Sequence, residues 1–313
     1  MAVIGVDVGG TKIAAGRLGP GLVVERTLVI PTPEGGEVIL RAVAAAVADL
    51  SADSTEPITA IGVGIPATID SVTGLAAHSV HTDMRAFEAA GPLEQLTGLP
   101  VHLDNDGNLA MLAEHRVGAA QGFDTALLLT VGTGIGGGIL IEGRVFRGGR
   151  GHGAELGHVS VDGNGPPCQG ACPGRGCLET MCSGTALARE FRAFAAANPG
   201  TPLGALHAEG RLDSVSGVDL AQAGDGDARE IVSTAGRWLG VGIASLCNAF
   251  DPDVVIIGGG VSEAGELLLG PARAVYQERA LPPTRRAPLV PAAFGPEAGL
   301  VGAGVMAADG GRR

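Results

Sequence analysis

The sequence has few aromatic residues, no long apolar run and no excess of positive charge. Its 313 residues include one Trp, one Tyr and seven Phe, so the core must be built from Ala, Val, Leu and Ile. No segment reaches the roughly 18 uninterrupted apolar residues of a membrane span. The N-terminus has no basic segment followed by an apolar one, so no export signal is expected. A net charge of −12 argues against a general binder of nucleic acid or membrane surfaces.

Cysteine is also scarce, and the five cysteines are unevenly placed. Three of them lie close together and follow a histidine. The set comprises His158, Cys168, Cys172 and Cys177. This spacing is typical of a metal site rather than a disulfide framework, and such ligands suit a closed structural zinc site. Free thiols in a loop rich in Gly and Pro are the alternative. Cys182 and Cys247 are expected in helices as core thiols, and the cytoplasm is the expected location.

Glycine, by contrast, is abundant, with 53 residues in short clusters. The first informative cluster follows an apolar run that ends in Asp7, and it comprises Gly9, Gly10, Thr11 and Lys12. Apolar residues on both sides predict two strands joined by a tight turn, whose N–H groups can approach a nucleotide phosphate. Asp7 at the strand end would suit a metal ion held through water. An ordinary hairpin with an Asp in its turn is the alternative.

The segment 126–135 repeats this pattern. Aligning Gly9 with Gly132 places Asp7 opposite Thr130 and Thr11 opposite Gly134. The repeat indicates a duplicated domain, with two loops that hold a triphosphate across a cleft. Only the first copy has the carboxylate. The glycines of the second copy also match G-x-G-x-x-G, but a strand at 138–141 follows where the dinucleotide fingerprint needs a helix, which disfavours a dehydrogenase.

Strands and helices are expected to alternate along the chain. Strands are expected at 22–24 with 27–30, 58–65, 101–103, 126–131 and 253–257. Helices are expected at 37–50, 109–117, 183–197, 218–250 with a break near 224–227, and 301–308. The alternation predicts an α/β fold with some parallel pairing, and the length predicts about two domains. The Gly- and Arg-rich segment 146–153 is expected to be a surface loop.

Several carboxylates lie at expected strand ends. They are Asp7, Asp70, Asp104 and Asp106. On extended backbone Asp104 and Asp106 would share a face. If a helix begins near Asp106, that residue could equally be its N-cap. Composition alone does not single out a catalytic base.

Seven short motifs then occur in one order over nearly the whole chain, and each is weak alone. They are Asp7–Lys12, Gly64–Pro66, Asn105–Asp106, Gly132–Gly136, Glu155–His158, Gly176–Glu179 and Ile257–Gly260. The ordered set resembles the ROK family (repressor, open reading frame, kinase) of sugar kinases, within the actin/hexokinase/Hsp70 superfamily. The resemblance implies two ribonuclease H-like α/β domains with a cleft between them. They would comprise residues 1–118, completed by the C-terminal helix 299–313, and residues 119–298 with the zinc loop 158–179.

The resemblance also implies roles in binding ATP and Mg²⁺. Asp7 would orient the magnesium ion. The phosphates would be held by Gly9, Gly10, Thr11, Lys12, Thr133 and Gly134. The adenosine would lie by Gly258, Gly259 and Gly260.

For the sugar, the resemblance implies that Asn105, Asp106, Glu155, His158 and Glu179 bind hydroxyl groups. Asp106 would be the catalytic base, which accepts a hydroxyl proton while that oxygen attacks the γ-phosphorus in line. His158 would also ligate the structural Zn²⁺, and the zinc loop would fix His158 and Glu179 beside the sugar. Domain closure is expected to exclude water.

The sequence departs from the family pattern at three places. The interval from Cys168 to Cys172 is longer than the usual Cys-x-Cys, which predicts a longer loop with the zinc retained. Ala67 stands where relatives often have Gly, and His78–Thr82 replaces a stretch that often contains Asn-x-x-Trp. The identity of the sugar is therefore the weakest expectation: glucose to glucose 6-phosphate first, then N-acetylglucosamine, N-acetylmannosamine, mannose or fructose.

Three other functions compete with the hexose kinase. A sugar-responsive repressor would carry a DNA-binding domain before the first loop, but only six residues precede Asp7, so a fragment aside this function is excluded. A catalytically silent sugar-binding protein is disfavoured because Asp7 and Asp106 are both present. Nothing demands polyphosphate as the donor. Relatives lead us to expect a homodimer or homotetramer, with no nucleic-acid or membrane partner.

Overall fold

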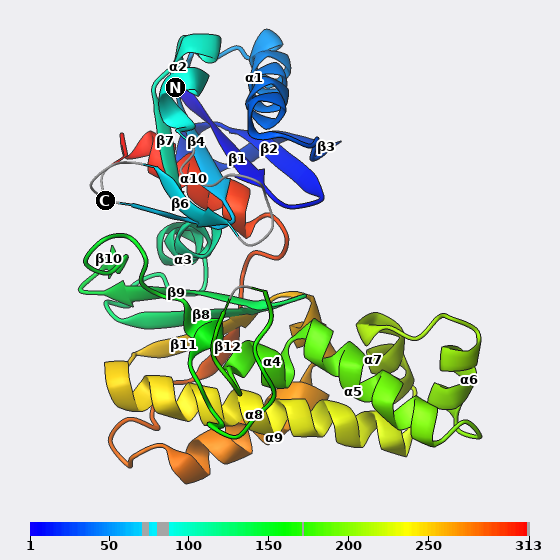
Figure 1. Cartoon of the computed structure of the whole chain (residues 1–313). Coiled ribbons are helices and arrows are strands. Elements are labelled where there is room, and N and C mark those ends of the chain that lie inside the picture. The colour runs from blue at the N-terminus through cyan, green and yellow to red at the C-terminus, as the bar shows by residue number, and fades with distance from the viewer. Residues whose placement is uncertain (71–74, 80–87, 171, 312–313) are drawn as a thin grey trace. The chain divides into compact units, whose positions relative to one another are not determined.

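The computed structural model describes residues 1–70, 75–79, 88–170 and 172–311 (Figure 1). The chain divides into two compact units. Unit 1 comprises Met1–Asp124, Gly138–Ala154 and Ala292–Arg313, and unit 2 comprises Thr125–Gly137 and Glu155–Pro291. Relative to the expected domains, unit 1 also includes residues 119–124, 138–154 and 292–298.

Unit 1 is built on a five-stranded sheet of order β3-β2-β1-β4-β7. Its strands are β1 (Ala2–Val8), β2 (Lys12–Leu18), β3 (Val24–Pro31), β4 (Ile58–Ile65) and β7 (Val101–Asn105). β1 pairs antiparallel with β2 and parallel with β4, and β4 pairs parallel with β7. The predicted N-terminal hairpin is thus confirmed. The third strand begins at Val24 because Pro20–Leu22 forms a short 3₁₀ turn, η1. The short strands β5 (Ala67–Ile69) and β6 (Ala76–Ser79) form a separate antiparallel pair.

Helices cover both faces of this sheet (Figure 1). α1 (Gly36–Ala52) and α2 (Ala90–Thr97) pack on one face, and α3 (Asp106–Val117) and α10 (Ala298–Ala308) on the other. Side chains of β1 alternate accordingly: Ile4 lies in the core beneath α1, and Val3 lies in the core beneath α10. Asp7 has the same parity as Val3, so it faces the side of α3 and α10.

α10 lies against the backbone of the sheet because the strands present glycine to it. A Cβ on Gly5 would lie 1.9 Å from the carbonyl oxygen of Leu300, and a Cβ on Gly62 would lie 1.9 Å from that of Ala303. Residues 299–307 of α10 are all buried, as expected for a helix that is apolar on every side. This close approach places the start of α10 over the end of β1.

The second sheet has the order β10-β9-β8-β11-β12. Its strands are β8 (Ala126–Val131), β9 (Ile135–Ile141), β10 (Arg144–Val145), β11 (Val254–Gly258) and β12 (Leu289–Pro291). β11 pairs parallel with both β8 and β12. β9 begins in unit 2, and its part from Gly138 onward is assigned with β10 to unit 1.

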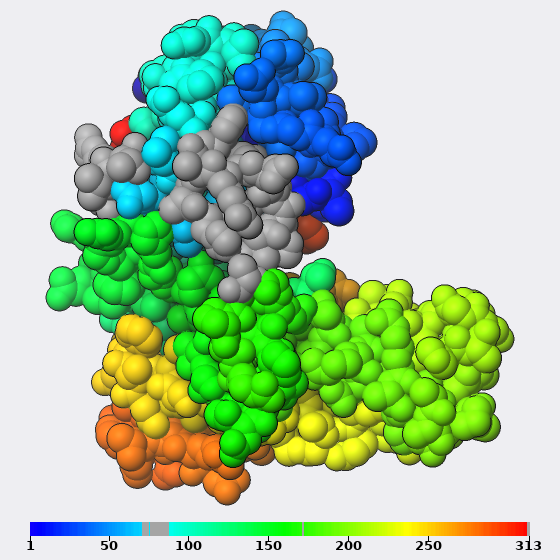
Figure 2. Space-filling model, in the orientation of Figure 1, coloured from blue at the N-terminus to red at the C-terminus, as the bar shows by residue number. Residues whose placement is uncertain are grey.

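Helices make up most of the rest of unit 2. They are α4 (Leu178–Cys182), α5 (Gly184–Ala197), α6 (Pro202–Ala208), α7 (Ser214–Gln222), α8 (Gly226–Phe250) and α9 (Glu266–Arg279), with the 3₁₀ turns η2 (Leu156–His158) and η3 (Gly260–Ala264). α5, α6 and α7 form a lobe at one end of this unit (Figure 2).

The predicted break before the long helix is confirmed, since Asp225 caps α8 by accepting the N–H of Ala228. Cys182 and Cys247 are buried in α4 and α8, as predicted. Among the residues described, no helix is long and apolar enough to cross a membrane.

A buried carboxylate fastens α3 to the segment that leads into α10. Glu114 is fully buried. Its Oε2 accepts the N–H groups of Ala119 at 2.8 Å and Ala293 at 3.1 Å, and its Oε1 accepts that of Phe294 at 3.0 Å. An ionised carboxylate is acceptor-only, so it can satisfy three donors that have no partner in a sheet or helix.

We expect Glu114→Gln to lower the free energy of unfolding by about 2–4 kcal/mol, because the amide places a donor against buried N–H groups. Urea unfolding followed by circular dichroism measures this change. Glu34 is exposed in the same unit, and Glu34→Gln should change stability by less than about 0.5 kcal/mol. Equal stability of the two variants would contradict the role of Glu114.

Candidate active site

The polar residues of unit 1 meet at the carboxyl ends of three parallel strands. In the register of the sheet, Asp7 of β1 pairs with Gly64 of β4, and Gly64 pairs with Asp104 of β7. Asp7 and Asp104 therefore lie in one row, with Cα atoms about 10 Å apart. Gly64 has no side chain between them, and a Cβ there would lie 2.8 Å from Cδ1 of Leu109 in α3 and 3.6 Å from Oδ1 of Asp7. The row places two carboxylates on one face of the sheet edge.

Asp7 lies in an environment that disfavours its charge. The first turn of α10 covers it, because a Cβ on Gly299 would lie 2.6 Å from the carboxyl carbon. Burial, and then the negative charge of Asp106, raise the pKa of Asp7 from 3.8 to about 7, while Lys12 opposes the shift. Within the described part of the chain its side chain accepts no hydrogen bond. A carboxylate with free lone pairs and a raised pKa fits the predicted partner of a hydrated cation.

The turn from β7 into α3 positions the predicted base. Asn105 is the N-cap of α3, and its Oδ1 accepts the N–H groups of Gly107 at 2.9 Å and Asn108 at 3.2 Å. The alternative that Asp106 is the N-cap is therefore wrong. The expectation of extended backbone through Asp104 and Asp106 is also wrong, because β7 ends at Asn105. Asp106 is exposed in the first turn of α3, where the helix dipole favours a carboxylate.

Asn105 has one group left for a ligand. Its carbonyl oxygen is occupied by the cap, whereas its Nδ2 makes one long contact, 3.4 Å, to the carbonyl oxygen of Ala67. Asn105 can therefore donate to a ligand oxygen beside the carboxylate of Asp106. This donor and acceptor pair suits a single hydroxyl group.

Sequence reasoning missed the support beneath this turn. Arg147 belongs to the segment expected to be a surface loop, yet its side chain is only 13% exposed and forms an ion pair with Asp104. Asp104, 3% exposed, also accepts from the side chain of Asn108 at 3.1 Å. The spacing of Asp104 and Asn108, four positions across a strand end, was the available signal. Nothing in the sequence connects either residue to Arg147.

In unit 2, the second loop is a tight turn between β8 and β9. The N–H of Gly132 donates to the carbonyl oxygen of Gly134 at 2.9 Å, as the N–H of Gly9 does to Lys12 in the first loop. The N-terminus of α5 fixes this turn: Gly184 donates to the carbonyl oxygen of Gly132 at 2.8 Å. Thr185 donates to that of Thr133 through both its N–H and its hydroxyl group.

A further glycine loop, Gly258–Gly260, lies against the start of the second loop. Gly259 has φ +87°, and a Cβ there would lie 2.4 Å from the carbonyl oxygen of Val131. Only glycine fits such a position. The structure thus brings together the two glycine loops of unit 2 that the sequence assigned to one nucleotide.

Glu179 also touches the second loop. Its Oε2 accepts the N–H of Ile135 at 2.8 Å, and a Cβ on Gly134 would lie 2.3 Å from the same oxygen. Glu179 lies in α4, two positions after Cys177, and His158 ends η2. Glu155 is exposed just before η2. The stretch His78–Thr82 was one of the three departures from the family pattern. Its residues 80–82 lie outside the described residues.

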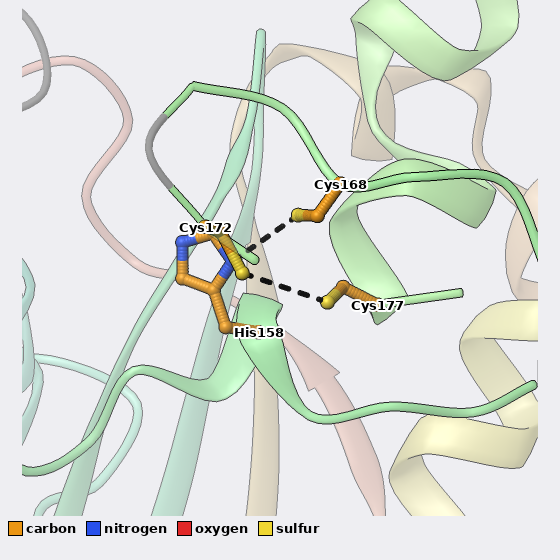
Figure 3. Close-up of side chains that lie close together, drawn as sticks. All are labelled: His158, Cys168, Cys172 and Cys177. Carbon is orange, nitrogen blue, oxygen red and sulfur yellow. Dashed lines mark hydrogen bonds between the residues drawn. The ribbon is translucent and has the colours of Figure 1, made fainter. Parts of the chain in front are cut away.

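The four predicted metal ligands converge (Figure 3). The ligand atoms of His158, Cys168, Cys172 and Cys177 all lie within 4.8 Å of one another. Sγ of Cys168 lies 3.5 Å from Nδ1 of His158, and Sγ of Cys172 lies 4.0 Å from Sγ of Cys177. Tetrahedral zinc would set these separations at about 3.5 and 3.7 Å. Without a cation, burial and then the neighbouring sulfurs raise the pKa of Cys177 to about 12. The residues therefore fit a zinc ion.

Comparison with known proteins supports the same picture. A sequence model of the ROK family matches residues 3–309. A glucokinase of Halalkalibacterium halodurans is 37% identical over 309 residues, which cover 96% of this chain and 93% of that protein. The crystal structure of a ROK family glucokinase from Streptomyces griseus, in complex with glucose and AMPPNP, matches with a TM-score of 0.86 at 36% identity and covers 99% of this chain and 100% of that one. A ROK hexokinase from Thermus thermophilus matches with a TM-score of 0.80 at 41% identity, covering 99% of both chains. The expected actin/hexokinase-like α/β fold is thereby confirmed.

The raised pKa of Asp7 predicts a pH-dependent stability of the ligand-free protein. Folding favours the protonated form of Asp7. The contribution of Asp7 to the free energy of unfolding is therefore fully present below about pH 4 and is lost as the pH rises through about 7. Asp7→Asn stays neutral, and at pH 8 it should be more stable than the wild type by up to about 4 kcal/mol. At pH 4 the difference should vanish. Urea unfolding at both pH values checks this, and parallel pH profiles for the two proteins would refute it.

Proposed function

Because the chain belongs to the ROK family, we propose that it is an ATP-dependent hexose kinase that converts glucose to glucose 6-phosphate. The observation that carries the proposal is the match of nearly the whole chain to a ROK family glucokinase that binds glucose and AMPPNP. Full-length similarity to a curated glucokinase supports it. The arrangement of Asn105 and Asp106 at the start of α3 supplies the chemistry.

Unit 1 would supply the base. Asp106 would accept the proton of the sugar hydroxyl as its oxygen attacks the γ-phosphorus, while Nδ2 of Asn105 would orient the same hydroxyl. Fixing this geometry accounts for most of the rate in phosphoryl transfer, because the protein does little covalent chemistry itself. Asp7 would hold a hydrated Mg²⁺, which neutralises charge on the phosphates when bound.

Unit 2 would hold the nucleotide and part of the sugar. The N–H groups of the second loop are presented by a turn whose carbonyl groups α5 already fixes, so they are preorganised for phosphate oxygens. Gly258–Gly260 would lie by the adenosine. Glu155, His158 and Glu179 would bind sugar hydroxyls, and Glu179 also contacts the second loop through Ile135.

We also propose that the Cys₃His set binds structural zinc. Purified protein should contain about one zinc per chain, and Cys172→Ser should lose the metal and lower the melting temperature. Cys247 is a buried thiol away from the cluster in sequence, and Cys247→Ser should keep the zinc. Metal analysis by mass spectrometry measures both. Zinc far below one equivalent in the wild type would refute the site.

The assignment of the base is tested by ADP formation with a panel of hexoses. Wild-type protein should turn over glucose fastest, and Asp106→Asn should lower kcat by about 10²–10⁴-fold because the amide cannot accept the proton. Asp70→Asn, at another expected strand end, is the control. Undiminished turnover by Asp106→Asn would exclude that base. Absence of turnover with every sugar would favour a silent sugar-binding protein, and preference for another hexose would correct the substrate.

The remaining proposals concern assembly, location and the phosphate donor. We propose a homodimer or homotetramer, a cytoplasmic location suited to thiolate ligands, and no nucleic-acid or membrane partner. ATP is the proposed donor, in keeping with the AMPPNP bound by the Streptomyces griseus glucokinase.

A further inference from the structure

We propose that Arg147 is a positioning residue for the catalytic base and that it acts through the buried carboxylate of Asp104. The inference rests on the proposed kinase function. Arg147 does not need to touch ATP or sugar in this role. It would hold the strand-to-helix turn that carries Asp106.

The guanidinium of Arg147 makes its contacts within unit 1, to Asp104 and Val145. Its Nε donates to Oδ2 of Asp104 at 2.6 Å, and a terminal nitrogen lies 2.6 Å from the same oxygen. Nη1 donates to the carbonyl oxygen of Val145 at 3.1 Å. The side chains of Arg147 and Asp104 are only 13% and 5% exposed. The pair is therefore shielded from water, unlike an ordinary surface ion pair.

The other oxygen of Asp104 holds both sides of the catalytic position. Oδ1 accepts the N–H of Asn105 at 2.8 Å and Nδ2 of Asn108 at 3.1 Å. Asn105 in turn caps α3 through Gly107 and Asn108. Asp106 thus lies within a turn whose flanking residues are both fixed to one carboxylate. A buried carboxylate that accepts these bonds needs a partner for its charge, and Arg147 supplies that partner.

The segment that carries Arg147 touches α3 at a second place. A Cβ on Gly138 of β9 would lie 2.5 Å from Cβ of Met111 and 2.8 Å from the carbonyl oxygen of Gly107. The hairpin of β9 and β10 therefore packs on the first turns of α3, and Arg147 follows this hairpin. Two contacts, one steric and one ionic, hold the catalytic turn against the hairpin.

The first test compares Arg147→Met with Arg144→Met. Arg144 lies in the same hairpin and is exposed. We expect Arg147→Met to lower kcat for glucose about 10- to 100-fold, because small displacements of a catalytic group are costly. The KM for ATP should change less than about threefold, since the guanidinium is occupied by Asp104. A kcat within twofold of Arg144→Met, or a raised KM for ATP with unchanged kcat, overturns the proposal.

Compensation by a second substitution separates positioning from general damage. Arg147→Met leaves Asp104 charged without a partner, whereas Arg147→Met with Asp104→Asn removes that charge and keeps an acceptor for Asn105. The double variant should recover at least threefold in kcat over Arg147→Met. A double variant no faster than Arg147→Met overturns the role of the charge.

Two further measurements cover failure of folding or of the kinase assay. If Arg147→Met does not fold, Arg147→Lys replaces it: kcat should fall at least threefold, because one ammonium cannot reproduce the contacts to both Asp104 and Val145. A kcat within twofold of Arg144→Lys overturns the proposal.

If the wild type phosphorylates no hexose, the kinase function has failed, and amide hydrogen exchange then tests the positioning role of Arg147. The amides of Asn105, Gly107 and Asn108 should exchange at least tenfold faster in Arg147→Met or, where that does not fold, Arg147→Lys, and unchanged exchange overturns the proposal.

Discussion

The register of three parallel strands determines what unit 1 can do. β1, β4 and β7 are aligned so that Asp7, Gly64 and Asp104 form one row, with Asn105 one step beyond. A shift of one residue in either pairing would send one carboxylate to the opposite face, because side chains alternate along a strand. The negative charge of Asp106 contributes, after burial, to the raised pKa of Asp7. The proposed metal partner and base therefore depend on strand alignment.

The two related hairpins have divided the chemistry of the proposed reaction. The first ends its leading strand with Asp7, and the second has Thr130 at the aligned position. Unit 1 carries the carboxylates of Asp7 and Asp106, whereas in unit 2 Gly184 and Thr185 hold the second loop by donating to its carbonyl oxygens. The second hairpin is proposed to hold phosphates through its N–H groups, and in that role it would not need the carboxylate that Asp7 supplies in the first.

Local pattern predicted several elements, but it missed α2, α6 and α9 and gave no contacts between distant segments. The N-terminal hairpin, β4, α1 and the break before α8 followed from periodicity and turn residues. The three cysteines with His158 were evident from spacing, and the structure brings their ligand atoms together. The ion pair of Arg147 and Asp104 was not predictable, because 43 positions separate the residues and the surrounding glycines resemble a surface loop. The sequence left open whether Asp106 caps the helix, because Asn and Asp are both good caps, and the structure places Asn105 at the N-cap.

Glycine at position 134 links the proposed sugar and nucleotide sites of unit 2. Oε2 of Glu179 occupies the space that a Cβ there would need, and it holds the N–H of Ile135. A residue proposed to bind sugar thus also shapes the loop proposed to bind phosphate. Because Glu179 follows Cys177 by two positions, a metal ion at the cysteines would order one segment that serves both substrates. In the proposed reaction, the metal ion would act on the substrates indirectly, through the carboxylate of Glu179.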